Sequence, residues 1–164
     1  MIRKKKMYKR PTKAFEKKRM EEENELVKKY GLKNKREVWK SLARLNYFRK
    51  RAMALTKLNL GEQEVFLNKL KEIGLKVYSI SDVLNLKVED ILDRRLPTIL
   101  SNKKLANSVK HARQLVTHKK ILIKGHVINS PSYLVRVDEE NVLSIKEKKP
   151  KEIKQEVKEV VLNE

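Results

Sequence analysis

Cysteine is absent from this sequence, and aromatic residues make up only 5% of it. Without cysteine the chain has no disulfide, no thiol nucleophile and no cysteine-based metal site. No stretch approaches the roughly 18–20 consecutive apolar residues that a membrane span needs. The N-terminus is basic, but no apolar segment follows it, so we expect no signal peptide. These absences favour an intracellular protein, and a length of 164 residues supports one domain or two small ones.

Acidic residues are missing from a long internal segment. None occurs from Arg94 through Val137, although 21 of the 164 residues are Asp or Glu. By proportion about five or six would fall in this acid-free span. The whole chain carries a formal net charge of +20, which indicates a polyanionic partner. Nucleic acid is the first candidate, and an acidic membrane surface is the alternative.

The first 13 residues form a basic lead with no acid and little apolar surface. We predict an arm that becomes ordered on RNA; the alternative is a solvated, disordered tail. Its candidate RNA-binding residues are Arg3, Lys4, Lys5, Lys6, Lys9 and Arg10. At the other end, residues 146–164 alternate in charge and are predicted to be a disordered or loosely docked tail.

Residues 14–80 are predicted to be helical. Thr12 can cap a helix that runs to Tyr30 and stops at Gly31. A long amphipathic helix then starts at Asn34, which fits a capping box with Glu37. Its predicted inward residues are Val38, Leu42, Leu45, Ala52 and Leu55, with Trp39, Tyr47 and Phe48 also assigned to the core. The opposite side carries candidate phosphate contacts, namely Lys40, Arg44, Arg49, Lys50 and Arg51.

Two further helices are expected between residues 61 and 96. One covers residues 61–73, with Gly74 as its stop and Val65, Phe66, Leu70 and Ile73 inward. The other covers residues 87–96, and Pro97 ends or bends it because proline lacks an N–H.

The segment "SVKHARQLVTHKKILIKG", residues 108–125, contains no acid. Val109, Ala112, Leu115 and Val116 fall on one arc of a helical wheel, and the opposite arc holds only hydrogen-bond donors. Ser108 or Asn107 can cap this helix. A hairpin with Lys124-Gly125 at its turn follows, then predicted strands at 133–137 and 142–145. Residues 81–145 therefore form a small α+β module behind the helical region.

Several motifs together resemble a known family. "LDRRL" at 92–96, "ARQLV" at 112–116 with His118 behind it, Gly125 at the hairpin and Pro131-Ser132-Tyr133 are similar to the RNA-binding module of the S-four family of small-subunit ribosomal proteins. "EEENELVKKYGLKNKREVWK" and "LKVEDILDRRLP" resemble the archaeal and eukaryotic branch, called S-nine in eukaryotes. Two departures, Lys119-Lys120 for the usual Gly-His and Lys124-Gly125 for Asn-Gly, both add cations. The RNA face implied or predicted for the module is Arg94, Arg95, Lys103, Lys104, Ser108, Lys110, His111, Arg113, Gln114, His118, Lys119, Lys120 and Lys124.

The resemblance implies a structural constituent of the small ribosomal subunit. Such a protein is a primary binder of small-subunit ribosomal RNA that nucleates assembly, beside neighbouring ribosomal proteins in the cytoplasm. It implies no enzymatic activity, no cofactor and no small-molecule substrate. The alternatives are a free-standing RNA chaperone and an RNA-modifying enzyme with the same module, but residues 1–80 lack a Gly-rich phosphate loop or a nucleophile–base pair.

Three histidines raise the question of a zinc site. His111, His118 and His126 have poor spacing for metal ligands, and no cysteine accompanies them. We therefore expect solvated or phosphate-contacting histidines and no metal.

The pattern predicts that Arg113→Glu weakens RNA binding more than Lys146→Glu. Each lost phosphate contact is also expected to flatten the plot of log affinity against log salt by about one. Binding titrations of both variants at several salt concentrations measure this. Equal losses would contradict an RNA face at residues 108–125.

Overall fold

The computed structural model describes residue 6 and residues 8–146. The helices of this part of the chain are α1 (Lys17–Lys29), α2 (Lys35–Leu55), α3 (Leu60–Glu72), α4 (Ile80–Asn85), α5 (Val88–Asp93), α6 (Leu96–Asn102), α7 (Val109–Thr117) and α8 (Val137–Glu140). Three short strands, β1 (Ile121–Ile123), β2 (His126–Val127) and β3 (Leu143–Ile145), form an antiparallel sheet in the order β2-β1-β3. The predicted α+β class is confirmed.

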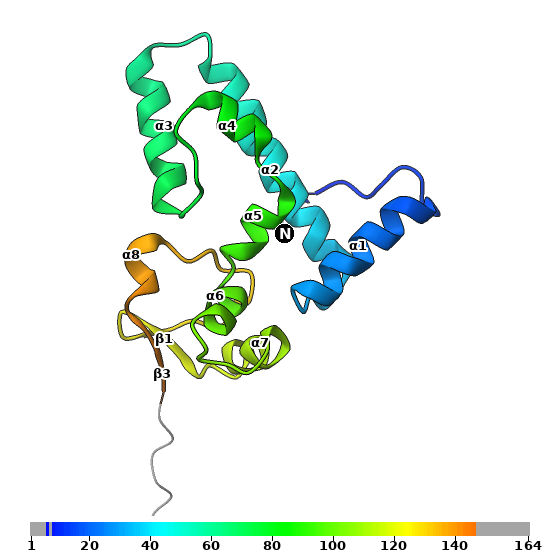
Figure 1. The fold of residues 1–164 in the computed structure, drawn as a ribbon, viewed down its shortest axis with the longest axis vertical. Coiled ribbons are helices and arrows are strands. Elements are labelled where there is room, and N and C mark those ends of the chain that lie inside the picture. Colours follow the sequence, from blue (N-terminus) through cyan, green and yellow to red (C-terminus); the bar gives the residue numbers. More distant parts are fainter. Residues whose placement is uncertain (1–5, 7, 147–164) are drawn as a thin grey trace, which may run out of the picture.

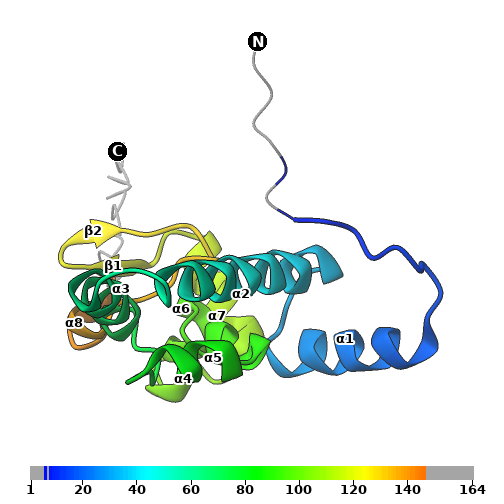
Figure 2. The same ribbon diagram turned by 90° about the horizontal axis from the view of Figure 1, so that it is seen from above.

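The long helix α2 organises the N-terminal half (Figure 1). Helices α3, α4 and α5 pack along it, and α1 leaves its N-terminal end in another direction. A second lobe, made of α6, α7, the sheet and α8, lies below α2 in Figure 1. Seen from above in Figure 2, α1 lies at the opposite end of the molecule from β2 and α8. Among the described residues, no helix is both long enough and apolar enough to cross a membrane.

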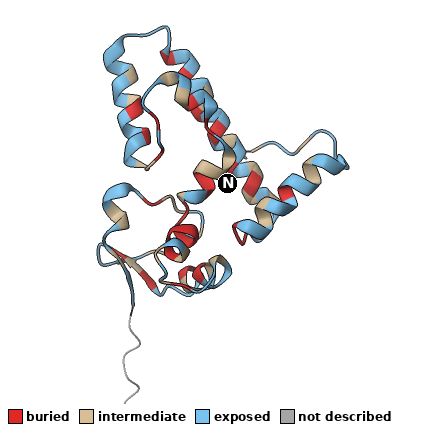
Figure 3. Ribbon diagram, in the orientation of Figure 1, coloured by how far each residue is buried: buried red, intermediate tan, exposed pale blue. Residues whose placement is uncertain are grey.

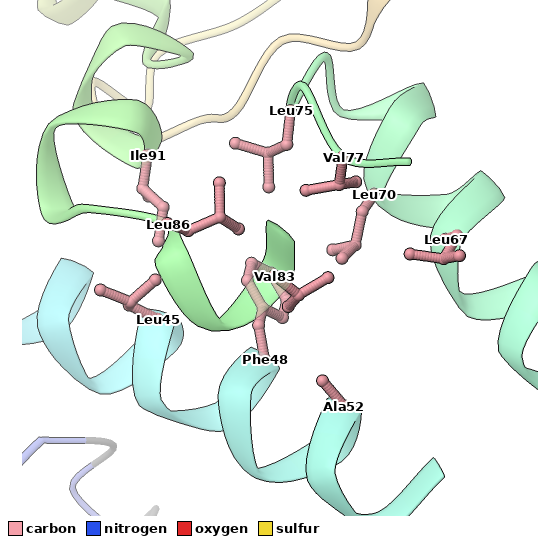
Figure 4. Packing of buried hydrophobic residues seen from close by; sticks show 10 residues of the cluster. All are labelled: Leu45, Phe48, Ala52, Leu67, Leu70, Leu75, Val77, Val83, Leu86 and Ile91. Carbon is pink, nitrogen blue, oxygen red and sulfur yellow. The ribbon is translucent and has the colours of Figure 1, made fainter. Parts of the chain in front are cut away.

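The first hydrophobic cluster fills the space between α2, α3, α4 and α5 (Figure 4). Leu45, Phe48 and Ala52 of α2 face Leu70 of α3, and Val83 of α4 is fully buried among them. Burial of such apolar side chains is the main stabilising contribution to this lobe. Residues 80–91 therefore pack with the N-terminal helices, whereas the predicted unit began at residue 81.

A separate cluster holds the second lobe together. Leu96 and Leu100 of α6 pack against Ala112 and Val116 of α7 and against Ile121 of β1. Figure 3 shows buried positions concentrated where these elements meet, while the outer sides of the helices are exposed. The described chain thus has two large apolar centres, joined where α5 continues into α6.

A third, smaller cluster attaches α1. Tyr30 and Leu32, just after α1, are buried beside Val38 of α2 and Leu92 of α5. The Tyr30 hydroxyl donates a hydrogen bond to a carboxylate oxygen of Asp93 at 2.8 Å. Gly31, with φ of +55°, ends α1 as predicted.

Two expectations about element boundaries were wrong. Helix α1 starts at Lys17 rather than after Thr12, because the Arg19 guanidinium binds the carbonyls of Lys13 and Ala14 and holds them in a turn. Residues 133–137 make only an isolated bridge, between Leu134 and Arg95. This segment hydrogen-bonds to the α5–α6 junction, and Val137 already begins α8.

Some predicted inward residues face solvent. Leu42, Tyr47 and Val65 are 42%, 63% and 55% exposed, whereas Phe48 is buried as expected. Helical periodicity gives a range of positions that could face the core, and it does not say which of them are buried. In α3, Leu67 packs into the cluster, whereas Val65 does not. Pro97 does not bend a helix but occupies the first turn of α6, where its missing N–H is harmless.

Gly74→Ala is expected to destabilise the protein by about 2 kcal/mol, because left-handed backbone alone costs a side-chain-bearing residue about 1–2 kcal/mol. Gly74 has φ of +87°, and an added Cβ would lie 2.5 Å from the Cζ of Arg94. That guanidinium is held by the carbonyls of Ile73 and Val135. Urea unfolding measures the difference.

Gly61 supplies the control for this experiment. It lies in α3, and a Cβ there meets no atom within 4 Å. Gly61→Ala is therefore expected to stabilise the protein by up to about 1 kcal/mol, since alanine favours helix. Losses of similar size at both positions would contradict this account of Gly74.

Candidate nucleic-acid interface

Helix α7 presents the polar face that the sequence predicted. The Ser108 hydroxyl caps it by accepting a hydrogen bond from the His111 backbone N–H at 3.2 Å. Ala112 and Val116 are buried against α6. The side facing solvent exposes Lys110, His111, Gln114 and His118, and Lys119 and Lys120 follow it. These cations and donors thus share one accessible surface.

The hairpin extends this surface. Lys124 and Gly125, with φ of +50° and +80°, form the two-residue turn between β1 and β2. Positive φ at both central positions is the geometry of the primed turns that suit a hairpin. Lys124 is exposed at the tip. We call the exposed set Lys104, Lys110, His111, Gln114, His118, Lys119, Lys120 and Lys124 the cationic face.

Lysine replaces glycine at two helix ends on this face. Four helices end with the paired bonds of a Schellman motif, in which the residue after the C-cap has positive φ. In α1 and α3 that residue is glycine, Gly31 and Gly74. In α6 and α7 it is Lys104 and Lys119, with φ of +56° and +58°. A lysine in this conformation is less favourable than glycine by about 1 kcal/mol.

Glu37 joins the two lobes through arginines that the sequence analysis assigned to the RNA face. Its carboxylate accepts hydrogen bonds from Arg95 at 2.7 Å and from both terminal nitrogens of Arg113 at 2.7 and 3.0 Å. Arg95 is only 4% exposed. Asn34 is the N-cap residue of α2, but its side chain makes no capping hydrogen bond, and the Glu37 backbone N–H donates to the Asn34 carbonyl instead. The predicted capping box is therefore wrong, because the Glu37 carboxylate binds Arg95 and Arg113 and does not reach back to the Asn34 N–H.

The ion pairs set the charge state of Glu37. Burial alone would raise the pKa of its carboxyl group, but hydrogen bonds from Arg113 and Arg95, and their positive charges, lower it to about 2. Glu37 is therefore ionised at any physiological pH. Glu37 is the only acidic residue between Lys33 and Lys57. A single acid in such a basic segment is the feature of the sequence that could have indicated a structural role for it.

Arg94 and Lys103 also have internal partners. Arg94 donates to the carbonyls of Ile73 and Val135 and to a carboxylate oxygen of Glu140, at 2.8, 3.0 and 3.0 Å. The Lys103 ammonium group binds the Glu140 carbonyl. These side chains connect α5, α6 and α8.

The cationic side chains of α2 also fall into two groups, one with an internal hydrogen-bond partner and one exposed to solvent. Arg49 donates to the Leu86 carbonyl at 2.7 Å, whereas Lys40, Arg44, Lys50 and Arg51 are exposed. The ring of Tyr8 lies 6.2 Å from that of Trp39, which places the basic arm beside α2. Lys6, Lys9 and Arg10 are exposed there. The predicted arm residues Arg3, Lys4 and Lys5 lie outside the described residues.

Two further predicted features can now be located. His111, His118 and His126 are all exposed, and no group of metal-ligating side chains gathers anywhere in residues 6 and 8–146. The Lys146 backbone N–H donates to the Lys120 carbonyl at 2.7 Å. Lys146 is thus a neighbour of the cationic face, and Lys146→Glu is a poor control for it. Arg113→Glu would also place a new carboxylate against that of Glu37, so its effect would not report on RNA contact alone.

Residues 94–141 match the S4 domain. The fold and the cationic face therefore define a protein built on that module, with a helical extension before it. Most of the chain also resembles proteins called small ribosomal subunit protein uS4. The relative from Methanocella arvoryzae is 41% identical over 85% of this chain and 75% of its own. Those from Ignicoccus hospitalis and Thermoplasma acidophilum are 43% and 41% identical, over 81% and 88% of this chain and 84% and 77% of theirs. The chain belongs to the uS4 family, and the resemblance noted from its motifs is confirmed.

Glu37→Gln is expected to lower the free energy of unfolding at pH 7 by about 3 kcal/mol, because it leaves Arg95 buried beside a neutral group. The pKa of Glu37 is about 2 in the folded protein against an ordinary 4.5. The contribution of the carboxylate is therefore complete above about pH 4.5 and is lost as the pH falls toward about 2. Urea unfolding at pH 7, 4.5 and 3 measures it.

The difference between wild type and Glu37→Gln is thus expected to shrink by more than half at pH 3. Glu64→Gln, on an exposed position of α3, is the matched control and is expected to change little at any pH. A difference between wild type and Glu37→Gln that stays constant from pH 7 to 3 would contradict the ionic role of Glu37.

Proposed function

We propose that this protein is a structural constituent of the small ribosomal subunit that binds ribosomal RNA through its cationic face. The observation that carries the proposal is the absence of every carboxylate from residues 94–137, on a module whose exposed side is rich in lysine. Membership of the uS4 family supports it. The protein acts by binding and not by catalysis.

Electrostatics explains why such a surface excludes acids. Each lysine that neutralises a phosphate releases condensed counterions, and this release supplies much of the affinity. A carboxylate within about 8–10 Å, the Debye length at physiological salt, would repel the same phosphate. The helix and the hairpin tip form a convex ridge, which suits recognition of folded RNA by its backbone and shape. Side chains cannot enter the narrow major groove of an RNA helix.

The two lysine helix ends support the same function. Where α1 and α3 end outside the acid-free span, the chain uses glycine, and where α6 and α7 end within it, the chain uses lysine. Backbone strain of this kind persists where another requirement outweighs it. Here the requirement is positive charge directed at a phosphate.

The arginines have a different role in this proposal. Arg95 and Arg113 fix α7 relative to α2 through Glu37, and Arg94 fixes the α5–α6 junction. They position the surface, and the exposed lysines of the cationic face contact the RNA. The α2 cations Lys50 and Arg51 and the basic arm extend the contact.

The proposed setting is the small subunit in the cytoplasm. The protein binds ribosomal RNA early in assembly, nucleates the fold of the RNA around it, and stays beside neighbouring ribosomal proteins. Retention on small-subunit particles during sedimentation in high salt is the expected behaviour, whereas a free RNA chaperone would wash off.

Lys104→Gly combined with Lys119→Gly is expected to weaken binding to a small-subunit ribosomal RNA transcript by about tenfold and to flatten the salt dependence by about two. The same double variant is expected to be as stable as wild type or more stable, by up to about 1 kcal/mol per position, because glycine suits left-handed backbone. Filter binding at several salt concentrations and urea unfolding give the two readouts.

Lys57→Gln combined with Lys69→Gln removes the same charge from exposed positions away from the cationic face and serves as the control. It is expected to bind RNA more tightly than the glycine double variant. Equal binding by the two double variants would mean that only net charge matters, and the cationic face would then not be the contact surface.

A further inference from the structure

A small cavity of about 220 Å³ opens between α2 and the S4 domain. Four cationic side chains line it, namely Lys40, Arg44, Arg95 and Arg113. A single carboxylate, that of Glu37, and the Ser132 side chain also line it. Glu37 comes from the first turn of α2, Arg113 from α7 and Ser132 from the loop after β2, so both lobes contribute to the walls. The cavity is distinct from the exposed cationic face, which lies on the outer side of α7 and the hairpin.

The charge inside the cavity is not balanced. Glu37 already accepts three hydrogen bonds from Arg95 and Arg113, which occupy both of its oxygens. No carboxylate among the described lining residues is left for Lys40 and Arg44. The lining groups therefore carry a formal excess of three positive charges, which favours an anion.

Arg95 supplies an independent indication of a ligand. Its side chain is 5% exposed, and its Nη2 and Nε donate to Glu37 and to the Pro131 carbonyl. Its Nη1 is buried and has no hydrogen-bond partner within the part of the chain that the structure describes. Buried guanidinium nitrogens are rarely left without an acceptor, so this atom calls for an oxygen ligand.

Arg44 is unfavourably placed without such a ligand. Arg44 as a whole is exposed, but burial of its guanidinium end lowers the pKa of that group, and the positive charge of the nearby Arg95 lowers it further. Two like charges beside a cavity repel each other, and an anion between them reverses that repulsion. The position of Arg44 thus agrees with the excess charge and with the unpaired nitrogen of Arg95.

The size and chemistry of the cavity select the anion. Pockets that hold drug-sized molecules run from about 300 to 1,000 Å³, so this one suits a single oxyanion group better than a whole nucleotide. None of its described lining residues is aromatic, so no platform for stacking a base is present among them. Guanidinium groups match phosphate oxygens in planar geometry and charge.

We propose that this cavity binds one phosphate group of the RNA backbone, held by Arg44, Lys40 and the guanidinium of Arg95, all of which line it. The proposal rests on the proposed RNA-binding function and adds a contact that the acid-free span alone does not indicate, because Lys40 and Arg44 belong to α2. The bound phosphate links α2 to the S4 domain from the solvent side of the Glu37 network. RNA binding therefore reinforces the orientation of the two lobes that the Glu37 hydrogen bonds already set.

The first experiment titrates inorganic phosphate into the full chain, with sodium chloride at equal ionic strength as the reference. The signal is the NMR resonance of the Arg95 Nε–H group, which the Pro131 carbonyl holds. A saturable shift with phosphate and none with chloride is expected. Lys40→Gln combined with Arg44→Gln is expected to weaken this phosphate binding at least tenfold, without disturbing the Glu37 hydrogen bonds.

The second experiment measures binding to the small-subunit ribosomal RNA transcript over a range of salt. The Lys40→Gln/Arg44→Gln variant is expected to flatten the plot of log affinity against log salt by about one, the value for one lost phosphate. The Lys57→Gln/Lys69→Gln variant, with the same charge change, is expected to keep the wild-type slope. Unfolding in urea without phosphate confirms that both variants fold.

The outcomes separate the two proposals. If wild type fails to bind the RNA transcript, the proposed function itself is wrong. If wild type binds RNA but the Lys40→Gln/Arg44→Gln variant matches the control in affinity and slope, the phosphate site is wrong and the cationic face stands. Saturable inorganic phosphate binding together with unchanged RNA binding would likewise overturn the assignment to an RNA phosphate.

Discussion

The arrangement of this protein depends on one carboxylate. Glu37 is placed by the first turn of α2 and holds Arg95 and Arg113, which belong to the beginning and the middle of the S4 domain. The two large hydrophobic clusters lie on either side of this contact and do not merge. Apolar packing therefore acts mainly within each lobe, with Leu134 of the S4 domain packing against the first cluster, and the polar network adds the charged contact between α2 and α7. Removing one partner of such a buried pair is costly, because it leaves the other charge without compensation.

The acid-free span takes its counter-charges from elsewhere in the chain. Arg95 and Arg113 use Glu37 of α2, and Arg94 uses Glu140 of α8, so each carboxylate comes from outside residues 94–137. These carboxylates are partly buried at the lobe boundary and are shielded from an approaching polyanion. The exposed lysines of the cationic face form no ion pair with any carboxylate in the part of the chain that the structure describes. Within this basic span, the arginines thus stabilise the interior through ion pairs, and the lysines of the cationic face remain on the surface, where RNA can reach them.

Local patterns were enough to predict much of this fold. The period of Ala112 and Val116, the Ser108 cap and the Lys124-Gly125 turn depend on neighbouring residues, and the structure bears them out. The roles of Arg95 and Arg113 were beyond such reasoning, because their partner lies 58 and 76 residues away. The same limit explains residues 133–137, which alternate like a strand but bind the α5–α6 junction instead. Sequence alone finds cations, but only the tertiary contacts divide them into internal and exposed ones.

The contact between α2 and the S4 domain is made in part by charged groups, so a bound ion can alter its stability. A ligand that binds only the folded arrangement stabilises it by an amount that grows with ligand concentration. At the Glu37 boundary four cationic side chains line the same cavity as one carboxylate, so an anion bound there would offset the excess positive charge. An apolar boundary of the same size would be indifferent to such an anion. RNA is the anion present in the proposed setting, and the local concentration of its phosphates rises as soon as the cationic face has bound. The proposed phosphate contact would therefore reinforce the orientation that the Glu37 network sets without RNA.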